Sequence, residues 1–185
     1  MNNDEQGAPL DPAFQMIEEG NIVGLTSLLD NGLNVDLEDG DDETLLCYAA
    51  RSNNIEIATL LIARGANVNG VNEANRPITY AIYEHGQHDG NYQDNSAVIQ
   101  LLIARGANVT LHDFASARIN YGQPNQTPEQ QQINAQILRS LAAHPNLARE
   151  AEVNREMRRL NIAASPNIVS KSLERLDGRG RDGGR

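Results

Sequence analysis

The sequence predicts an all-α protein built as a helical repeat solenoid, and three observations support that prediction. The nine-residue run LLIARGANV occurs twice, at 60–68 and at 101–109, and a looser copy, SLLDNGLNV, occupies 27–35. The glycines that close these runs are 33 and 41 residues apart, so the second interval is the same unit with an insertion. Self-similarity at such a period marks one supersecondary unit stacked on itself. Tryptophan is absent and aromatic residues make up 4%, which suits helices packed on leucine, isoleucine and alanine.

Each unit opens on a segment that predicts a first, inner helix. These segments are DPAFQMI at 11–17, TLLCYAA at 44–50 and RPITYAI at 76–82. Pro12 and Pro77 fall in the first turn, where proline loses no helical hydrogen bond and its φ is already suitable. The alanines of the second and third segments let neighbouring inner helices approach closely.

Each unit continues with a second, outer helix. Ile57, Leu60 and Leu61 lie at spacing i, i+3, i+4, and residues 98–102 repeat that spacing. The spacing predicts one apolar stripe along a helix. The glycine that closes each run, such as Gly65, ends the helix where a left-handed residue is needed. No unit can bury its stripe alone, so the units must stack.

Together these features resemble the ankyrin repeat, whose units open on T-P-L-H-x-A-A and recur at about 33 residues. The resemblance covers residues 10–110 well and 111–144 more loosely. It implies two antiparallel helices per unit, with a hairpin-like finger projecting between successive units. The histidine of the family opening is replaced here by Phe14, Cys47 and Thr79.

The remaining elements follow from local signals. We expect a helix at 112–121, a helix start at Thr127-Pro128-Glu129 and a further helix from Leu147 to Leu160. Residues 161–176 include an amphipathic stretch that could fold back, bind a partner or mediate self-association. The expected organisation is a flexible N-terminus at 1–9, a repeat domain at 10–144 (units 10–36, 37–69 and 70–110, capping unit 111–144), C-terminal helices at 145–176 and a disordered tail at 177–185.

Charge is distributed unevenly along the chain. Residues 1–50 hold twelve acidic residues and no lysine or arginine, and the whole chain carries a net charge of −10. This distribution argues against nucleic-acid binding by the repeat face, which would repel phosphates. It favours a basic protein partner steered to the N-terminal half, although simple solvation is the alternative. A single cysteine and the lack of a long apolar stretch predict a cytoplasmic protein with no membrane span or secretory signal.

Acidic residues are most concentrated on the finger that we expect between the first and second units. A calcium loop is one alternative, but the spacing does not fit the D-x-[DN]-x-[DN]-G pattern, so no metal is predicted there. Within the resemblance, fingers and inner helices form the binding surface, and tyrosines on that face suit a protein interface. The predicted partner-binding residues are Glu38, Asp39, Asp41, Asp42, Glu43, Tyr48, Arg51, Asn75, Tyr80, Tyr83 and Glu84.

The insertion at 85–96 is expected at the end of the unit opposite the fingers. Its glycines, asparagines and aspartates predict a flexible loop. His85 to Asp89 raises the alternative of a metal-dependent activity, but two histidines three apart lack the remaining ligands. Cys47 stands at a packing position, and no phosphate loop, H-E-x-x-H or C-x-x-C occurs.

The sequence therefore predicts a non-enzymatic protein–protein interaction module without a cofactor. One alternative is a microbial effector, delivered into a host cytosol, or a regulatory inhibitor that targets a host or cellular enzyme. The resemblance also implies one modification, because Asn69 occupies the finger position that ankyrin proteins present to an asparaginyl hydroxylase in animal cells.

Overall fold

The computed structural model describes residues 11–88, 91–123, 126–147 and 151–162. The chain divides into two compact units, one ending at Asn108 and the next starting at Val109. The predictions for residues 1–9, 163–176 and 177–185 lie outside the described residues.

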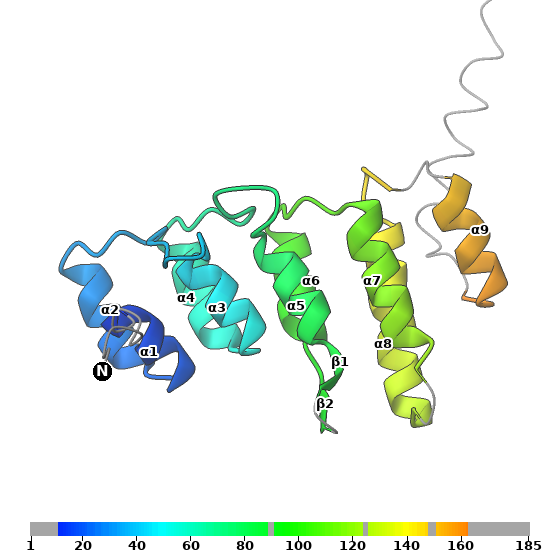
Figure 1. Cartoon of the computed structure of the whole chain (residues 1–185), viewed down its shortest axis with the longest axis horizontal. Coiled ribbons are helices and arrows are strands. Elements are labelled where there is room, and N and C mark those ends of the chain that lie inside the picture. Colours follow the sequence, from blue (N-terminus) through cyan, green and yellow to red (C-terminus); the bar gives the residue numbers. More distant parts are fainter. Residues whose placement is uncertain (1–10, 89–90, 124–125, 148–150, 163–185) are drawn as a thin grey trace, which may run out of the picture. The chain divides into compact units, whose positions relative to one another are not determined.

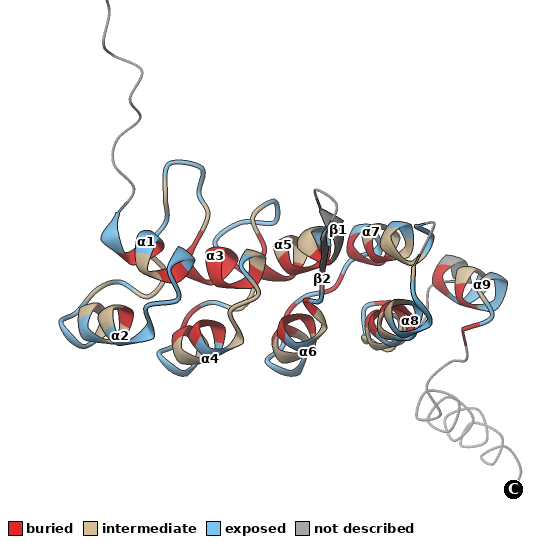
Figure 2. Ribbon diagram, turned by 90° about the horizontal axis from the view of Figure 1, so that it is seen from below, coloured by how far each residue is buried: buried red, intermediate tan, exposed pale blue. Residues whose placement is uncertain are grey.

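The first unit is a row of helix pairs. Its inner helices are α1 (Pro12–Glu18), α3 (Leu45–Arg51) and α5 (Pro77–Glu84), and its outer helices are α2 (Ile22–Asp30), α4 (Ile55–Ala63) and α6 (Ser96–Ala104). Inner helices pack on inner helices and outer on outer, as the contacts of α3 with α5 and of α4 with α6 show (Figure 1). Figure 2 shows these as two layers, with buried residues where the layers face each other. The predicted all-α repeat solenoid is confirmed.

The helix boundaries follow from local capping. Asp11 and Thr44 cap the first two inner helices through their side-chain oxygens, and Asn54 caps α4 in the same way. Each such bond satisfies a backbone N–H that has no partner within its helix. Gly65 follows α4 at φ +93°, the left-handed conformation that a side chain disfavours, and Gly106 repeats it at +91°.

The pattern of buried and half-buried side chains repeats from one unit to the next, as the sequence does. Leu61 and Leu102 are both fully buried, whereas Leu60 and Leu101 are both half-buried, so equivalent residues occupy equivalent environments. The outer helix α2 differs, because Leu25 is its one buried residue. Among the described elements, α2 makes its main contacts with α1 and α4.

The insertion is not the flexible loop that the sequence predicted. Two strands, β1 (Gly86–His88) and β2 (Asn91–Gln93), pair antiparallel, with Gly86 opposite Gln93. Short polar strands pair through their backbones and need no alternating apolar pattern, so these strands carry no signal in the sequence. The hairpin lies at the end of the unit away from the fingers, as predicted (Figure 1).

Two side chains fasten the hairpin to the preceding helix pair. The Gln93 Nε2 donates to the carbonyl oxygen of Arg51 at 3.0 Å, and the Asn53 Nδ2 donates to that of Asp94 at 2.9 Å. Asn53 itself has φ +53°, in the turn between α3 and α4.

The second unit holds α7 (Leu111–Tyr121), α8 (Pro128–Ala142) and α9 (Ala151–Arg159). Thr127 begins α8 with a capping box, which confirms the predicted start, and α7, capped in the same way by Thr110, starts one residue before the predicted 112. The helix predicted from Leu147 begins at Ala151, and residues 148–150 lie outside the described part. Arg118 of α7 forms an ion pair with Glu156 of α9 at 3.2 Å.

Candidate partner-binding site

The first finger, between α2 and α3, is a small hairpin organised by Asp39. Glu38 and Thr44 form an isolated antiparallel bridge across its base. The Asp39 Oδ1 accepts the backbone N–H groups of Asp41 at 2.9 Å and Glu43 at 3.0 Å. Asp42 takes φ +60°, a conformation that aspartate tolerates better than most residues. The predicted hairpin-like finger is confirmed here, and its carboxylates shape its own turn.

A buried tyrosine holds this finger against the inner helices. The Tyr48 hydroxyl donates to Asp39 Oδ2 at 2.7 Å, and its ring packs on Phe14 at a centroid distance of 4.7 Å. Tyr48 is 7% exposed. Burial and the bond to Asp39 raise the pKa of Tyr48 to about 12. Burial alone would raise the pKa of Asp39, but the Tyr48 hydroxyl and the two backbone donors outweigh it and lower that pKa.

A second carboxylate, Glu43, joins α3 to α5. Its Oε2 accepts from Arg51 Nη1 at 2.9 Å, and its Oε1 accepts from the Tyr80 hydroxyl at 2.8 Å. Burial and the bond to Glu43 raise the pKa of Tyr80. The Arg51 guanidinium lies 4.3 Å from the centroid of the Tyr48 ring and 6.0 Å from that of Tyr80.

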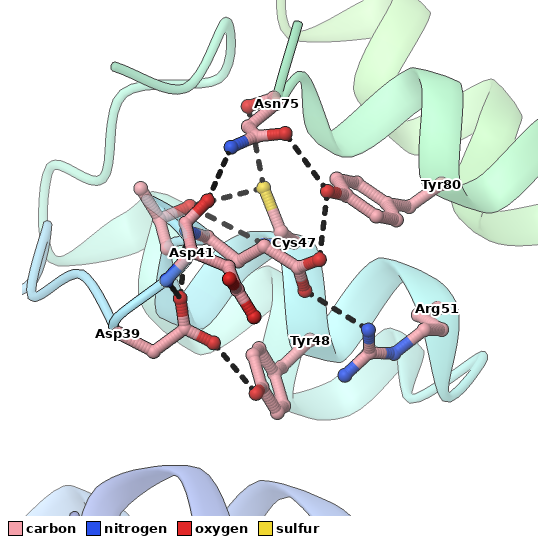
Figure 3. Close-up of polar contacts among 9 residues, drawn as sticks. Asp39, Asp41, Cys47, Tyr48, Arg51, Asn75 and Tyr80 are labelled. Carbon is pink, nitrogen blue, oxygen red and sulfur yellow. Dashed lines mark hydrogen bonds and ion pairs between the residues drawn. The ribbon is translucent and has the colours of Figure 1, made fainter. Parts of the chain in front are cut away.

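Asn75 lies on the second finger, between α4 and α5, and makes hydrogen bonds to these same residues. Its Nδ2 donates to the carbonyl oxygen of Asp41 at 2.7 Å, and its Oδ1 lies 3.0 Å from the Tyr80 hydroxyl. Its own carbonyl oxygen accepts from the Cys47 Sγ at 3.5 Å. We call Asp39, Glu43, Tyr48, Arg51, Asn75 and Tyr80 the finger cluster, and Figure 3 shows its hydrogen bonds.

The predicted contact residues therefore divide into two sets. Six form the finger cluster, where they bind one another. The other five lie around it: Glu38, Asp41, Asp42 and Tyr83 are exposed, and Glu84 is half-exposed. Tyr83 is 71% exposed although it lies three residues from Tyr80. Sequence reasoning missed both this division and the role of Phe14, because neither has a local signal.

The comparison with known families agrees with the geometry. The profile for ankyrin repeats, spanning three copies, matches residues 13–113, more than half of the 185 residues. The chain belongs to the ankyrin-repeat family. Members of this family are generally protein–protein interaction modules and are typically non-enzymatic. No curated protein matches the chain.

In this ankyrin-repeat protein Asn69 has a structural contact. Its Oδ1 accepts the backbone N–H of Asn108 at 2.7 Å, and Asp36, its equivalent one unit earlier, accepts that of Asn67 at 2.8 Å. Both side chains thus fasten the start of a finger to the following unit's Gly-Ala-Asn run. Hydroxylation of Asn69 stays a prediction.

In this ankyrin-repeat protein His85, between α5 and the hairpin, also packs internally. His85 is 3% exposed, and its Nδ1 accepts the backbone N–H of Asn95 at 3.0 Å. The Asp94 carboxylate lies 3.9 Å from that nitrogen. Within the described residues no group of three or more histidine, cysteine, aspartate or glutamate side chains could hold a metal. The side chains of His88 and Asp89 lie outside that part.

Burial determines the state of the lone cysteine. Cys47 is fully buried, and burial raises the pKa of its thiol. This buried thiol packs in place of the family histidine, an environment typical of structural rather than reactive cysteines. None of the helices that the structure describes is long and apolar enough to cross a bilayer.

Proposed function

We propose that this chain is a non-enzymatic recognition module that binds a basic protein through its first finger and the adjoining inner helices. One observation supports the proposal. The finger cluster holds the first finger in place, while the outer carboxylates of that finger take no part in the cluster. Glu38, Asp41 and Asp42 are exposed, and the described residues supply no ion pair to any of them.

A fixed finger suits recognition for an energetic reason. Ordering a loop on binding costs free energy, and a finger already held by Tyr48, Tyr80 and Asn75 avoids most of that cost. The exposed carboxylates then face a partner in a defined arrangement. Twelve acidic residues in the first fifty, with no lysine or arginine, attract a basic surface over several ångströms and favour its association rate.

The test is a charge reversal that leaves the finger cluster intact. The variant Glu38→Lys/Asp41→Lys changes two exposed side chains, and Glu18→Lys/Glu56→Lys makes the same change of charge at exposed positions away from the finger. Each purified protein is used to capture partners from a lysate at about 0.1 M salt and again at about 0.5 M, where surface attraction is largely screened. Captured proteins are quantified by mass spectrometry, and folding is checked by circular dichroism.

We expect the wild type and the Glu18/Glu56 variant to capture a common set of basic proteins. The Glu38/Asp41 variant should lose that set, as should the wild type at high salt. Equal loss in both variants would show that overall charge, not the finger, attracts the partners. An unchanged capture by the Glu38/Asp41 variant would refute the proposed surface.

A further inference from the structure

Arg51 is the first lysine or arginine of the chain, after fifty residues that carry none. Its side chain does not extend into solvent beside these acids. It is 33% exposed and lies in a slot formed by one carboxylate and two aromatic rings. The carboxylate is Glu43 at 2.9 Å, and the rings are those of Tyr48 at 4.3 Å and Tyr80 at 6.0 Å.

The walls of this slot match what a guanidinium binds. A guanidinium is flat, stacks on aromatic faces and donates to carboxylates from a fixed fork, whereas an ammonium is a compact, strongly hydrated point charge. The other Glu43 oxygen is bonded to the Tyr80 hydroxyl, so the carboxylate keeps its orientation without Arg51. Tyr48 is fixed independently by Asp39. The slot is therefore preformed, and Arg51 shows which chemical group it accepts.

We propose that this slot is a guanidinium subsite, filled by Arg51 in the free protein and by an arginine side chain of the basic partner in the complex. The inference rests on the proposed function and names the side chain that the surface recognises. Arg51 is at the last position of α3, and Glu84 on α5 already attracts it electrostatically. It can therefore leave the slot without losing every acidic neighbour.

The exchange keeps Glu43 paired throughout. A half-buried carboxylate that loses its cation without replacement is costly, but one guanidinium replacing another leaves no unpaired charge. Arg51 thus competes with the partner, and its removal should favour arginine ligands. This expectation is specific, because a general charge effect would favour arginine and lysine ligands equally.

The test removes one positive charge either at the slot or at a control position away from it. Arg51→Ala empties the slot, and Arg51→Met removes the same charge while keeping apolar packing on Tyr48. Arg64→Ala is the matched control, because Arg64 forms its ion pair with Asp30 on the outer helices, at 2.7 Å. The probes are two blocked glycine pentapeptides with a central arginine or a central lysine. Their dissociation constants are measured by NMR titration of the Tyr48 and Tyr80 ring signals.

We expect both Arg51 variants to bind the arginine peptide about fivefold more tightly than the wild type, which corresponds to about 1 kcal/mol. The gain for the lysine peptide should stay below twofold, and Arg64→Ala should match the wild type. Equal gains for both peptides, or equal gains in the Arg51 and Arg64 variants, would overturn the subsite. Failure of the Glu38/Asp41 capture test would instead refute the proposed function, so the two failures are distinguishable. A thermal melt of each variant confirms that the titrated protein is folded.

Discussion

The hydrogen bond from Tyr48 to Asp39 gives the most direct test of the finger cluster. Replacing Tyr48 with phenylalanine removes the hydroxyl and keeps the ring that packs on Phe14. A hydrogen bond to a charged group contributes about 1.5–3 kcal/mol. Asp39 is half-exposed and keeps two backbone donors on its other oxygen, so water and those donors offset part of the loss. We expect Tyr48→Phe to lower the free energy of unfolding by about 1–1.5 kcal/mol.

The assay is urea unfolding at pH 7, followed by far-ultraviolet circular dichroism. Tyr83→Phe is the control, because its side chain is 71% exposed and its substitution should stay within about 0.5 kcal/mol of the wild type. A double-mutant cycle with Asp39→Asn isolates the pair, and its coupling energy should be about 1 kcal/mol. A Tyr48→Phe effect no larger than that of Tyr83→Phe, or a coupling energy of zero, would refute the reasoning.

The same pair predicts a pH dependence. The pKa of Asp39 is lowered in the folded protein, so its contribution is present above the ordinary carboxyl pKa of about 3.9. That contribution is lost as the pH falls through the lower, folded value. The difference in unfolding free energy between wild type and Tyr48→Phe should therefore be constant from about pH 5 to pH 8 and shrink in stronger acid. A difference that grows on acidification would contradict this account.

Two further predictions concern the core and the tyrosine. Leu61→Ala should lower the unfolding free energy by about 2–5 kcal/mol, because Leu61 is fully buried; a loss below about 1 kcal/mol in urea unfolding would mean that the stripe is not a packed core. The pKa of Tyr48 is raised to about 12, so its stabilising contribution is complete below the ordinary value of about 10 and is lost as the pH rises through about 12. In absorbance titration of the tyrosines, the step that Tyr48→Phe removes should lie near pH 12, and loss of a step near pH 10 instead would contradict the assignment.

The repeat architecture could be predicted because its signals are local and recur. Gly65 and Gly106 close equivalent helices, and Leu60 and Leu101 share the same half-buried environment. The insertion shows the limit of such signals, since its strands pair through backbone groups whatever their side chains. The acidic finger could be located, but the sequence did not show that Asp39 and Glu43 bind the protein itself.

The sequence by itself therefore determined the unit, its period and its helices. A helix with an apolar stripe can bury that stripe only by packing on the equivalent helix of the next unit. Only the tertiary structure decided which side chains meet. Tyr80 and Glu43 are 37 residues apart, and their 2.8 Å contact depends on how the finger folds over two inner helices. The same packing made Tyr48 buried and Tyr83 exposed, because burial depends on neighbours contributed by other units of the stack.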